Sequence, residues 1–349
     1  MKEVLRNALS VSGNTYRKII DEMEPGSGGG GGDLNGIIAR TITTFSNSTI
    51  SRVGSFAFAY CTALTSINLP AATDIGNDAF YSCSVLTSVN LPAATDIGID
   101  AFCSCSALTS INLPAAISIG SSAFCYCSSL ASISLPEATC ISNYAFRSCT
   151  ALTSVDLPMA ISIGDNAFYF CSALTSINLP AATSIGECAF SYCYSLTTIN
   201  LPAAISVGGS AFNNCSALTS INLPAATYIG NYAFNFCHSL ASVSLPAATS
   251  IGSGAFSYCS VLTTVSLPAV TGIGSGAFYS CYRLLSLYLL GSRVVGLDNI
   301  KAFTNTPIST YTDYTDGVNG SIYVPASLYS QYISATNWST FSSRFVSVE

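Results

Sequence analysis

The chain has 349 residues, of which half are apolar and only 8% are charged, and its formal net charge is −6. This balance excludes a strongly basic surface for nucleic acid, which requires clustered lysine and arginine side chains. No apolar run is long enough to predict a membrane-spanning helix or membrane insertion, so the many apolar side chains must be hidden at regular intervals along the chain.

Residues 1–23 carry a heptad stripe, made of Leu5, Leu9, Ser12, Tyr16, Ile19 and Met23. This spacing predicts a helical anchor or oligomerisation segment. A pair of short helices is equally open, because Gly13 interrupts the stripe. Polar residues also interrupt the apolar start of the chain, so we expect no secretory signal peptide. The glycine-rich residues 24–33 predict a flexible linker.

Residues 34–57 predict an N-terminal cap that contains a degenerate first repeat. Ile42 and Phe45 stand there at the places where later repeats have Leu and Ile. We expect this segment to cover the first edge of a sheet, because an open edge exposes unpaired backbone groups.

Residues 58–290 repeat one 22-residue pattern eleven times, and each copy is called a rung. A rung begins with Phe, has Cys three residues later, and continues with Leu, Ile or Val, Leu, Pro, and Ile or Val followed by Gly, which Ser142 replaces once. The motif LTSINL alternates apolar and polar residues, which predicts a short strand that stops at Pro. The Gly predicts a positive φ or a close backbone approach, and the motif AFYSCSAL predicts a tight helical turn.

One rung buries too little apolar surface to offset the backbone entropy lost on ordering it, so the rungs must stack. The repeat therefore predicts a mainly β solenoid of parallel short strands, with a cap at each end. Its motif LxxIxLP…IGxxAFxxC resembles the BspA-like leucine-rich repeat family over roughly residues 42–303. The resemblance implies a parallel-stranded solenoid and a bacterial surface, adhesive or phage-associated protein.

Residues 291–349 predict a C-terminal cap. The register of the repeat is lost after Cys281, and the following sequence predicts a strand, a short helix after Pro325 and an aromatic closure that contains Trp338. The resemblance implies the same role, because caps of this kind close the open edge of such solenoids.

The fifteen cysteines do not follow the spacing of a disulfide framework. One Cys recurs at the same place in every rung, which predicts an internal column of free thiols that pack as small apolar groups. Cys103 and Cys125 are additional and stand on adjacent rungs, each two residues before a column cysteine. A zinc site at these two pairs is the alternative, and it is disfavoured because residues two apart in a tight turn face different ways.

Four acidic residues occupy matching places on the first two complete rungs: Asp74, Asp78, Asp96 and Asp100. Carboxylates so placed could hold Ca²⁺, which prefers several oxygen ligands. The alternative is a solvated acidic edge that promotes solubility. Apart from Ca²⁺, the sequence predicts no cofactor.

The residues that vary most between rungs follow the core Phe directly, and they form a candidate ligand-binding face: Tyr81, Tyr126, Arg147, Tyr169, Phe170, Tyr192, Phe236, Tyr258 and Tyr279. Tyr, Asn and Ser are the residues that adaptable binding surfaces use, whereas drift at exposed positions is the plain alternative. We expect the aromatic members to line one side of neighbouring rungs, away from the repeated Thr, Ser and Asn of the strands.

These patterns predict a recognition protein rather than an enzyme. The single histidine, His238, has no second histidine to act with it, and no glycine-rich loop joins a strand to a helix. The leading hypothesis is a phage virion accessory, a tail or head fibre made in the host cytoplasm, that binds a host-surface glycan or protein and attaches to the virion through residues 1–23. A structural spacer and a bacterial cell-surface adhesin are the alternatives, and homo-oligomerisation remains open.

Overall fold

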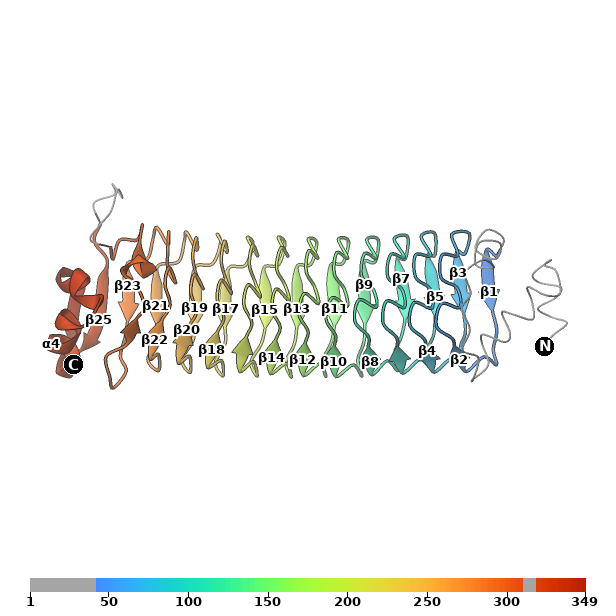
Figure 1. Cartoon of the computed structure of the whole chain (residues 1–349), viewed down its shortest axis with the longest axis horizontal. Helices are drawn as coiled ribbons and strands as arrows, with labels where there is room; N and C mark the ends of the chain where they lie inside the picture. The colour runs from blue at the N-terminus through green and yellow to red at the C-terminus, as the bar shows by residue number, and fades with distance from the viewer. Residues whose placement is uncertain (1–41, 310–317) are drawn as a thin grey trace. The chain divides into compact units, whose positions relative to one another are not determined.

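A computed structural model describes residues 42–309 and 318–349, and the expected anchor and linker at residues 1–33 lie outside this part of the chain. The described residues fall into two compact units, the first ending at Met159 and the second beginning at Ala160. Both units are built from rungs of short parallel strands, which confirms the predicted mainly β solenoid (Figure 1). No helix in the described part of the chain is long and apolar enough to cross a membrane.

In the first unit, neighbouring strands are parallel and pair residues that are 22 positions apart, as Ser66 pairs with Ser88. Each rung contributes one three-residue and one two-residue strand. The three-residue strands are β1 Thr44–Ser46, β3 Ser66–Asn68, β5 Ser88–Asn90, β7 Ser110–Asn112, β9 Ser132–Ser134 and β11 Ser154–Asp156. The two-residue strands are β2 Arg52–Val53, β4 Asp74–Ile75, β6 Asp96–Ile97, β8 Ser118–Ile119 and β10 Cys140–Ile141.

The second unit repeats this arrangement, with Ser176 paired to Thr198. Its three-residue strands are β13 Ser176–Asn178, β15 Thr198–Asn200, β17 Ser220–Asn222, β19 Ser242–Ser244, β21 Thr264–Ser266 and β23 Ser286–Tyr288. Its two-residue strands are β12 Ser162–Ile163, β14 Ser184–Ile185, β16 Ser206–Val207, β18 Tyr228–Ile229, β20 Ser250–Ile251, β22 Gly272–Ile273 and β24 Gly296–Leu297.

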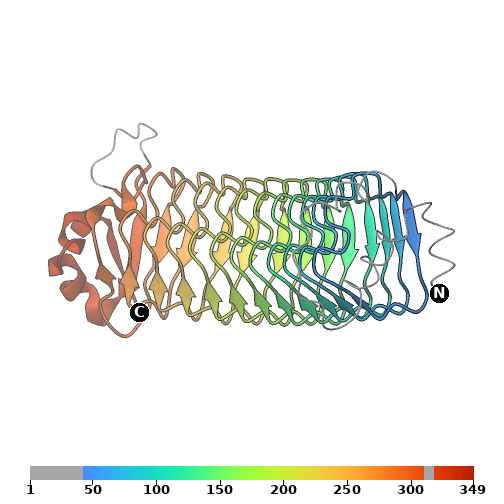
Figure 2. The same ribbon diagram turned by 45° about the vertical axis from the view of Figure 1, so that its right-hand side comes forward.

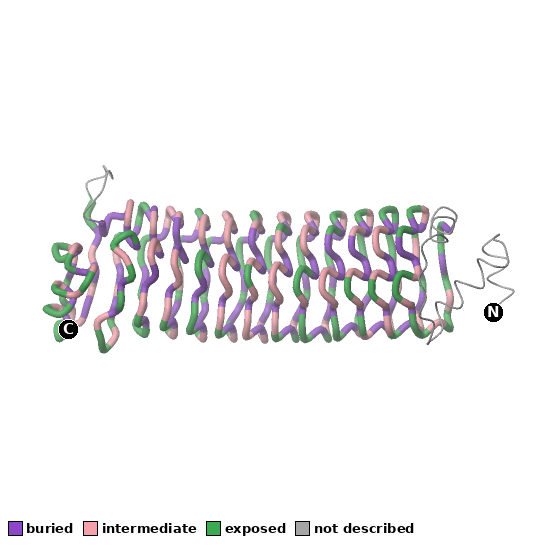
Figure 3. The backbone as a smooth tube through the Cα atoms, in the orientation of Figure 1, coloured by how far each residue is buried: buried purple, intermediate pink, exposed green. Residues whose placement is uncertain are grey.

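The alternation of apolar and polar residues decides which way each strand faces. In β5 the side chain of Val89 is buried, while Ser88 is exposed and Asn90 half-buried. Leu91 and then Pro92 follow, and the strand ends before them because Pro has no N–H to donate to the next rung. The same pattern recurs in each rung, so buried residues recur at the same places in both units (Figure 3).

The segment between each two-residue strand and the next three-residue strand is called the turn side, and it is not the helical turn that the sequence predicts. Along it, backbone N–H groups alternate between two acceptors. Phe80 N donates to Ala101 O of the next rung at 2.8 Å, whereas Tyr81 N donates to Asp78 O three residues back at 3.0 Å. The turn side is thus a chain of tight turns joined to neighbouring rungs, because two residues per rung take a positive φ, such as Asp78 and Ser82.

The core of each unit consists of columns of identical side chains. Successive Phe rings stack at centroid distances of 5.0–5.4 Å from Phe58 to Phe146 in the first unit. In the second unit the stack runs from Phe168 to Phe303 at 5.1–5.7 Å. Replacing one such Phe by Ala would leave a cavity and lower the free energy of unfolding by about 3–5 kcal/mol. The stacking of the rings requires a uniform spacing between rungs.

After the last complete rung, the second unit ends in two further strands and short helices (Figure 2). The elements are η1 Ile300–Phe303, β25 Ser321–Pro325, η2 Ala326–Leu328, α4 Tyr329–Ser334, η3 Trp338–Arg344 and β26 Phe345–Val348. β25 pairs in parallel with β23, and β26 with β25. Trp338 is buried, and its Nε1 donates to Val295 O at 2.7 Å. The strand and the short helix predicted for this segment are both present.

The Gly after each Ile is required by a close approach of backbones and not by a positive φ. A Cβ on Gly208 would lie 2.6 Å from the carbonyl carbon of Gly186 in the preceding rung. The neighbouring Gly209 is different, because its Cβ would meet nothing closer than 3.4 Å. A side chain at Gly208 would therefore clash with the preceding rung, whereas a side chain at Gly209 would not.

Gly208→Ala should lower the free energy of unfolding by about 1–3 kcal/mol, since the added methyl group forces two rung backbones apart. Gly209→Ala is the matched control and should change it by less than about 0.5 kcal/mol. Equilibrium denaturation of the two variants in urea measures the difference. Equal destabilisation by the two substitutions would contradict the assignment of Gly208 to the rung-to-rung contact.

Candidate recognition surface

The positions that follow each core Phe are held by the turn side. In every complete rung the second residue after Phe has a positive φ: Tyr60, Ser82, Ser104, Tyr126, Ser148, Phe170, Tyr192, Asn214, Phe236, Tyr258 and Ser280. Positive φ is ordinarily a glycine or asparagine conformation, and it is unusual for a bulky side chain. The inter-rung hydrogen bonds of these residues, such as Phe170 N to Ser191 O at 2.9 Å, hold them in place.

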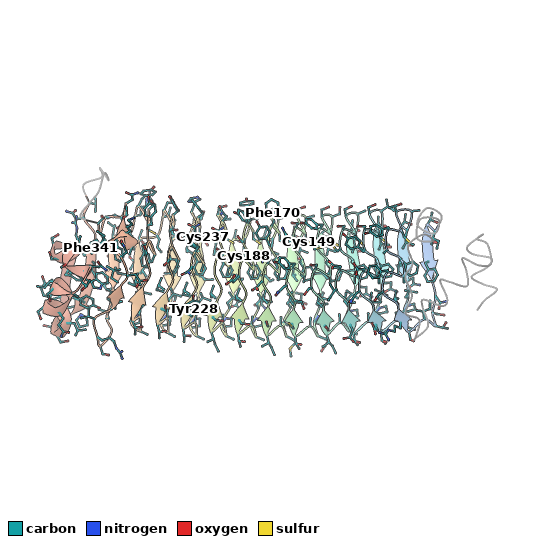
Figure 4. All side chains as sticks on the ribbon, viewed as in Figure 1. Cys149, Phe170, Cys188, Tyr228, Cys237 and Phe341 are labelled. Carbon is teal, nitrogen blue, oxygen red and sulfur yellow. A yellow bond between two sulfur atoms is a disulfide. The ribbon has the colours of Figure 1, made fainter. Side chains whose placement is uncertain are left out.

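Four aromatic residues in the second unit form the Phe170 cluster, which consists of Tyr169, Phe170, Tyr192 and Tyr194. The Tyr169 and Tyr192 rings meet edge to face at 5.4 Å, and Tyr194 lies 6.0 Å from Phe170 and 5.9 Å from Tyr192. Phe170 and Tyr194 remain 38% and 40% exposed. Figure 4 shows Phe170 at the outer edge of the turn side, whereas Tyr228 lies toward the two-residue strands.

A second group on the same unit is the Phe236 cluster, which consists of Phe236, His238, Tyr258 and Tyr279. Phe236 stacks on Tyr258 at 4.4 Å with nearly parallel planes. His238 meets the edge of Phe236 at 5.7 Å, and Tyr279 meets Tyr258 at 5.5 Å. His238 is exposed, as expected of a loop residue.

The aromatic row is interrupted between the two clusters. The intervening rung carries Asn214 where its neighbours carry Tyr192 and Phe236, and Asn213 beside it is in line with Ser191 and Asn235. Asn213 Nδ2 donates to Ser191 Oγ at 3.4 Å, and Asn235 Nδ2 donates to Asn213 Oδ1 at 3.0 Å. Ser257 Oγ extends this chain to Asn235 Oδ1. The surface therefore has two aromatic platforms separated at Asn214, and a hydrogen-bonded strip of amides and hydroxyls crosses the gap beside them.

Six of these eight residues belong to the candidate face predicted from the sequence, whereas Tyr194 and His238 do not. Both stand four residues after a core Phe, where most rungs have Ser or Thr. Their departure from the repeat was the available signal.

The predicted residues of the first unit make smaller groups. Tyr81 packs edge to face on Tyr60 at 5.3 Å. The guanidinium of Arg147 lies 5.9 Å from the Tyr126 ring and 5.6 Å from the Tyr144 ring. Such contacts between a cation and an aromatic face are attractive, so Arg147 supports these tyrosines.

The strand face is occupied by its own hydrogen bonds. Asn90 Nδ2 donates to Asn68 Oδ1 at 2.8 Å, and Asn112 Nδ2 donates to Asn90 Oδ1 at 3.1 Å. Where a Thr stands one residue before a strand, it can donate to a carbonyl of the preceding rung, as Thr87 Oγ1 does to Thr65 O at 3.0 Å. These side chains stabilise the stacking of rungs, which explains their repetition.

The four aspartates proposed for Ca²⁺ lie in two rows. Asp74 and Asp96 are partners on β4 and β6, and Asp74 forms an ion pair with Arg52 at 3.1 Å. Asp78 and Asp100 lie in the following turn, where partial burial raises the pKa of both carboxyls and the charge of Asp78 adds to the effect at Asp100. The calcium site stays a prediction.

The cysteines divide into a buried column and an outer pair. The column is confirmed as free thiols, and its members donate to backbone carbonyls, as Cys83 Sγ does to Phe58 O at 3.0 Å. Burial raises the pKa of the Cys127 thiol to about 12. Cys103 and Cys125 instead form a disulfide between adjacent rungs, with their Cα atoms 4.6 Å apart. The predicted zinc pairs are thus not assembled, because Cys105 and Cys127 face the core.

Thiol titration of the denatured chain without reductant should find thirteen free thiols, since the remaining two cysteines form the disulfide. In the native protein at pH 8, iodoacetamide should modify Cys140 first, because it is exposed while the column thiols are buried. Peptide mass spectrometry after each reaction measures both. Rapid native labelling of the column thiols would contradict their burial.

Comparison with known proteins gives a consistent picture. The family model described as "BspA type Leucine rich repeat region (6 copies)" matches residues 40–153, 95–217 and 205–315. A search of curated protein sequences finds no match.

Similar solved structures include a leucine-rich cell surface protein from Faecalibacterium prausnitzii, with 24% identity, 84% of this chain and 86% of that chain covered, and a TM-score of 0.46. A leucine-rich repeat protein from Bacteroides ovatus has 24% identity, coverage of 86% and 88%, and a TM-score of 0.45. One from Eubacterium ventriosum has 17% identity, coverage of 80% and 93%, and a TM-score of 0.43.

The family matches together span the rungs of both units, whose repeated Phe, Cys and Leu residues form the core columns and whose repeated Gly residues lie at the close backbone approaches. The chain belongs to the BspA-type leucine-rich repeat family.

Proposed function

We propose that this protein is a non-enzymatic recognition protein exposed outside the cytoplasm, and that its second unit binds a neutral carbohydrate on the turn side. The binding residues are those of the Phe170 and Phe236 clusters, with the strip of Asn and Ser between them. The candidate residues Tyr81, Tyr126 and Arg147 belong to the first unit and stay a separate prediction.

The observation that carries this proposal is the backbone conformation of the aromatic residues. Phe170, Tyr192, Phe236 and Tyr258 have φ values of 61°, 63°, 58° and 60°. A left-handed conformation costs an L-residue about 1–2 kcal/mol. Drift at an exposed position would favour Gly, Asn or Ser, as in other rungs, so large rings kept at this cost favour a role in binding.

The chemistry of the surface favours a neutral ligand rich in hydroxyl groups. The side chains of both clusters are aromatic and carry no carboxylate, ammonium or guanidinium group. Aromatic faces pack against the apolar faces of sugar rings, while the amides of Asn213 and Asn235 offer donors and acceptors at the edge. The strand-face ladder offers less, because its side chains are Asn, Ser and Thr and provide no aromatic face for a sugar ring.

The disulfide bears on location. Disulfides persist in oxidising surroundings and are rare in the cytoplasm, so the Cys103–Cys125 bond favours a bacterial cell-surface protein over a virion component assembled in host cytoplasm. The virion interpretation stays a prediction, because the attachment role it gives to residues 1–23 falls outside the described residues.

Replacing Phe170 and Tyr192 together with Gly separates binding from stability. The rings are lost, but Gly relieves the left-handed strain, so the free energy of unfolding should stay within about 1 kcal/mol of the wild type. Retention on an array of neutral oligosaccharides should fall to background. Array binding and urea denaturation of the full chain measure the two properties.

The control variant carries Asn178→Ala and Asn200→Ala, which remove one contact of the strand-face ladder. It should bind the array as the wild type does. If the Phe170→Gly, Tyr192→Gly variant binds the array as the wild type does and the control variant does not, the binding site lies on the strands instead. A wild-type chain that binds no oligosaccharide would overturn the carbohydrate proposal and favour a spacer.

A further inference from the structure

Three potential metal ligands meet at the outer cysteine pair of the first unit. The two Sγ atoms of Cys103 and Cys125 and a carboxylate oxygen of Asp100 all lie within 4.8 Å of one another. Both cysteines are 5% exposed, in contrast to column cysteines such as Cys105 and Cys127, which are fully buried. Both cysteines are buried, but they retain more exposure than the column thiols, and Asp100 beside them is half-buried.

We propose that reduction of the Cys103–Cys125 disulfide converts this place into a binding site for a thiophilic divalent cation such as Zn²⁺, with both cysteine thiolates and the Asp100 carboxylate as ligands. The oxidised protein has no such site, because both sulfur atoms are then bonded to each other. The disulfide thus acts as a redox gate on metal binding.

The backbone holds the three ligands together without help from the disulfide. Cys103 N donates to Asp100 O at 3.0 Å, which closes one turn around Asp100 and Cys103. Ser104 N donates to Cys125 O of the next rung at 2.7 Å, which fixes Cys125 beside that turn. Reduction therefore leaves the ligands side by side, and only the cysteine side chains need to rotate.

The dimensions suit zinc. Zn–S bonds are about 2.3 Å long and zinc prefers a tetrahedral arrangement, so two bound sulfur atoms lie about 3.8 Å apart. Cα atoms 4.6 Å apart allow that separation after a small side-chain rotation. Two thiolates and one carboxylate fill three positions, and a water molecule completes the fourth.

The local charge also favours a cation. Asp78 occupies the place of Asp100 in the preceding rung, and the two carboxylates repel each other. A cation bound to Asp100 offsets that repulsion. Cys105 and Cys127 do not compete as ligands, because their Sγ atoms donate to Phe80 O and Phe102 O in the core at 3.2 Å and 3.1 Å.

The chemical steps balance. A dithiol reductant transfers two electrons and two protons, the S–S bond breaks, two cysteine thiols form, and the reductant becomes a cyclic disulfide. Binding of Zn²⁺ then displaces both thiol protons, so two protons are released for each ion bound near neutral pH. Reoxidation with loss of the ion restores the disulfide.

The test uses the full chain, reduced with a dithiol and freed of reductant, and titrated with Zn²⁺ in competition with a chromophoric chelator. We expect one tight site per chain after reduction and none in the oxidised protein. Co²⁺ in place of Zn²⁺ should give a sulfur-to-metal charge-transfer band in the reduced protein only.

Matched variants identify the ligands. Cys125→Ser should abolish the charge-transfer band. Asp100→Asn should keep the band but weaken affinity by at least about ten-fold, the effect that losing even an outer-shell partner has. Cys140→Ser removes an exposed free thiol and should change nothing. Circular dichroism confirms folding of each variant, and Asp100→Asn, which keeps both cysteines, tests the site even if Cys125→Ser fails to fold.

Equal binding by oxidised and reduced protein would overturn the proposal. So would a charge-transfer band that persists in Cys125→Ser, an affinity unchanged in Asp100→Asn, or a loss of binding in Cys140→Ser. Absence of any tight site after reduction would leave the pair as a structural disulfide only and would equally overturn it.

Discussion

The 22-residue register of backbone hydrogen bonds between rungs is the constraint on which the rest of the structure depends. Strand residues pair with partners 22 positions away, and the turn side continues the same ladder. Because the register is uniform through the repeated rungs of each unit, every position of the repeat becomes a column. Each column then accommodates one kind of residue, which explains the repeated Phe, Cys, Leu and Gly.

The same constraint separates stability from recognition. Core columns and strand-face ladders carry the stacking of rungs, and a substitution there affects two neighbours at once. The turn side has places where a rung can differ without changing the ladder, because the inter-rung bonds use backbone atoms. Tyr169, Tyr192 and Tyr258 occupy such places. Individual rungs can therefore carry different side chains on the turn side, although the rungs are otherwise almost alike.

The sequence was sufficient to predict the solenoid, its strands and the thiol column, because each follows from periodicity and burial. The sequence was insufficient to predict the backbone conformation of the turn side. The motif AFYSCSAL has the composition of a helical turn, and the two positive-φ residues in each rung are mostly not Gly, as at Asp78 and Ser82, so local propensity gave no signal. The disulfide was missed because thiol geometry on adjacent turns depends on that backbone. Tyr194 and His238 were not predicted because each stands four residues after a core Phe, at a position that is Ser or Thr in most rungs.

Radical footprinting of tyrosines, with and without a saturating oligosaccharide selected on the array, tests the central claim most directly. Tyr169, Tyr192 and Tyr258 lie on the turn side, while Tyr228 is 46% exposed on β18 and serves as an internal reference. The account predicts strong protection of the three turn-side tyrosines and none of Tyr228. Protection of Tyr228 alone, or of no tyrosine, would contradict it.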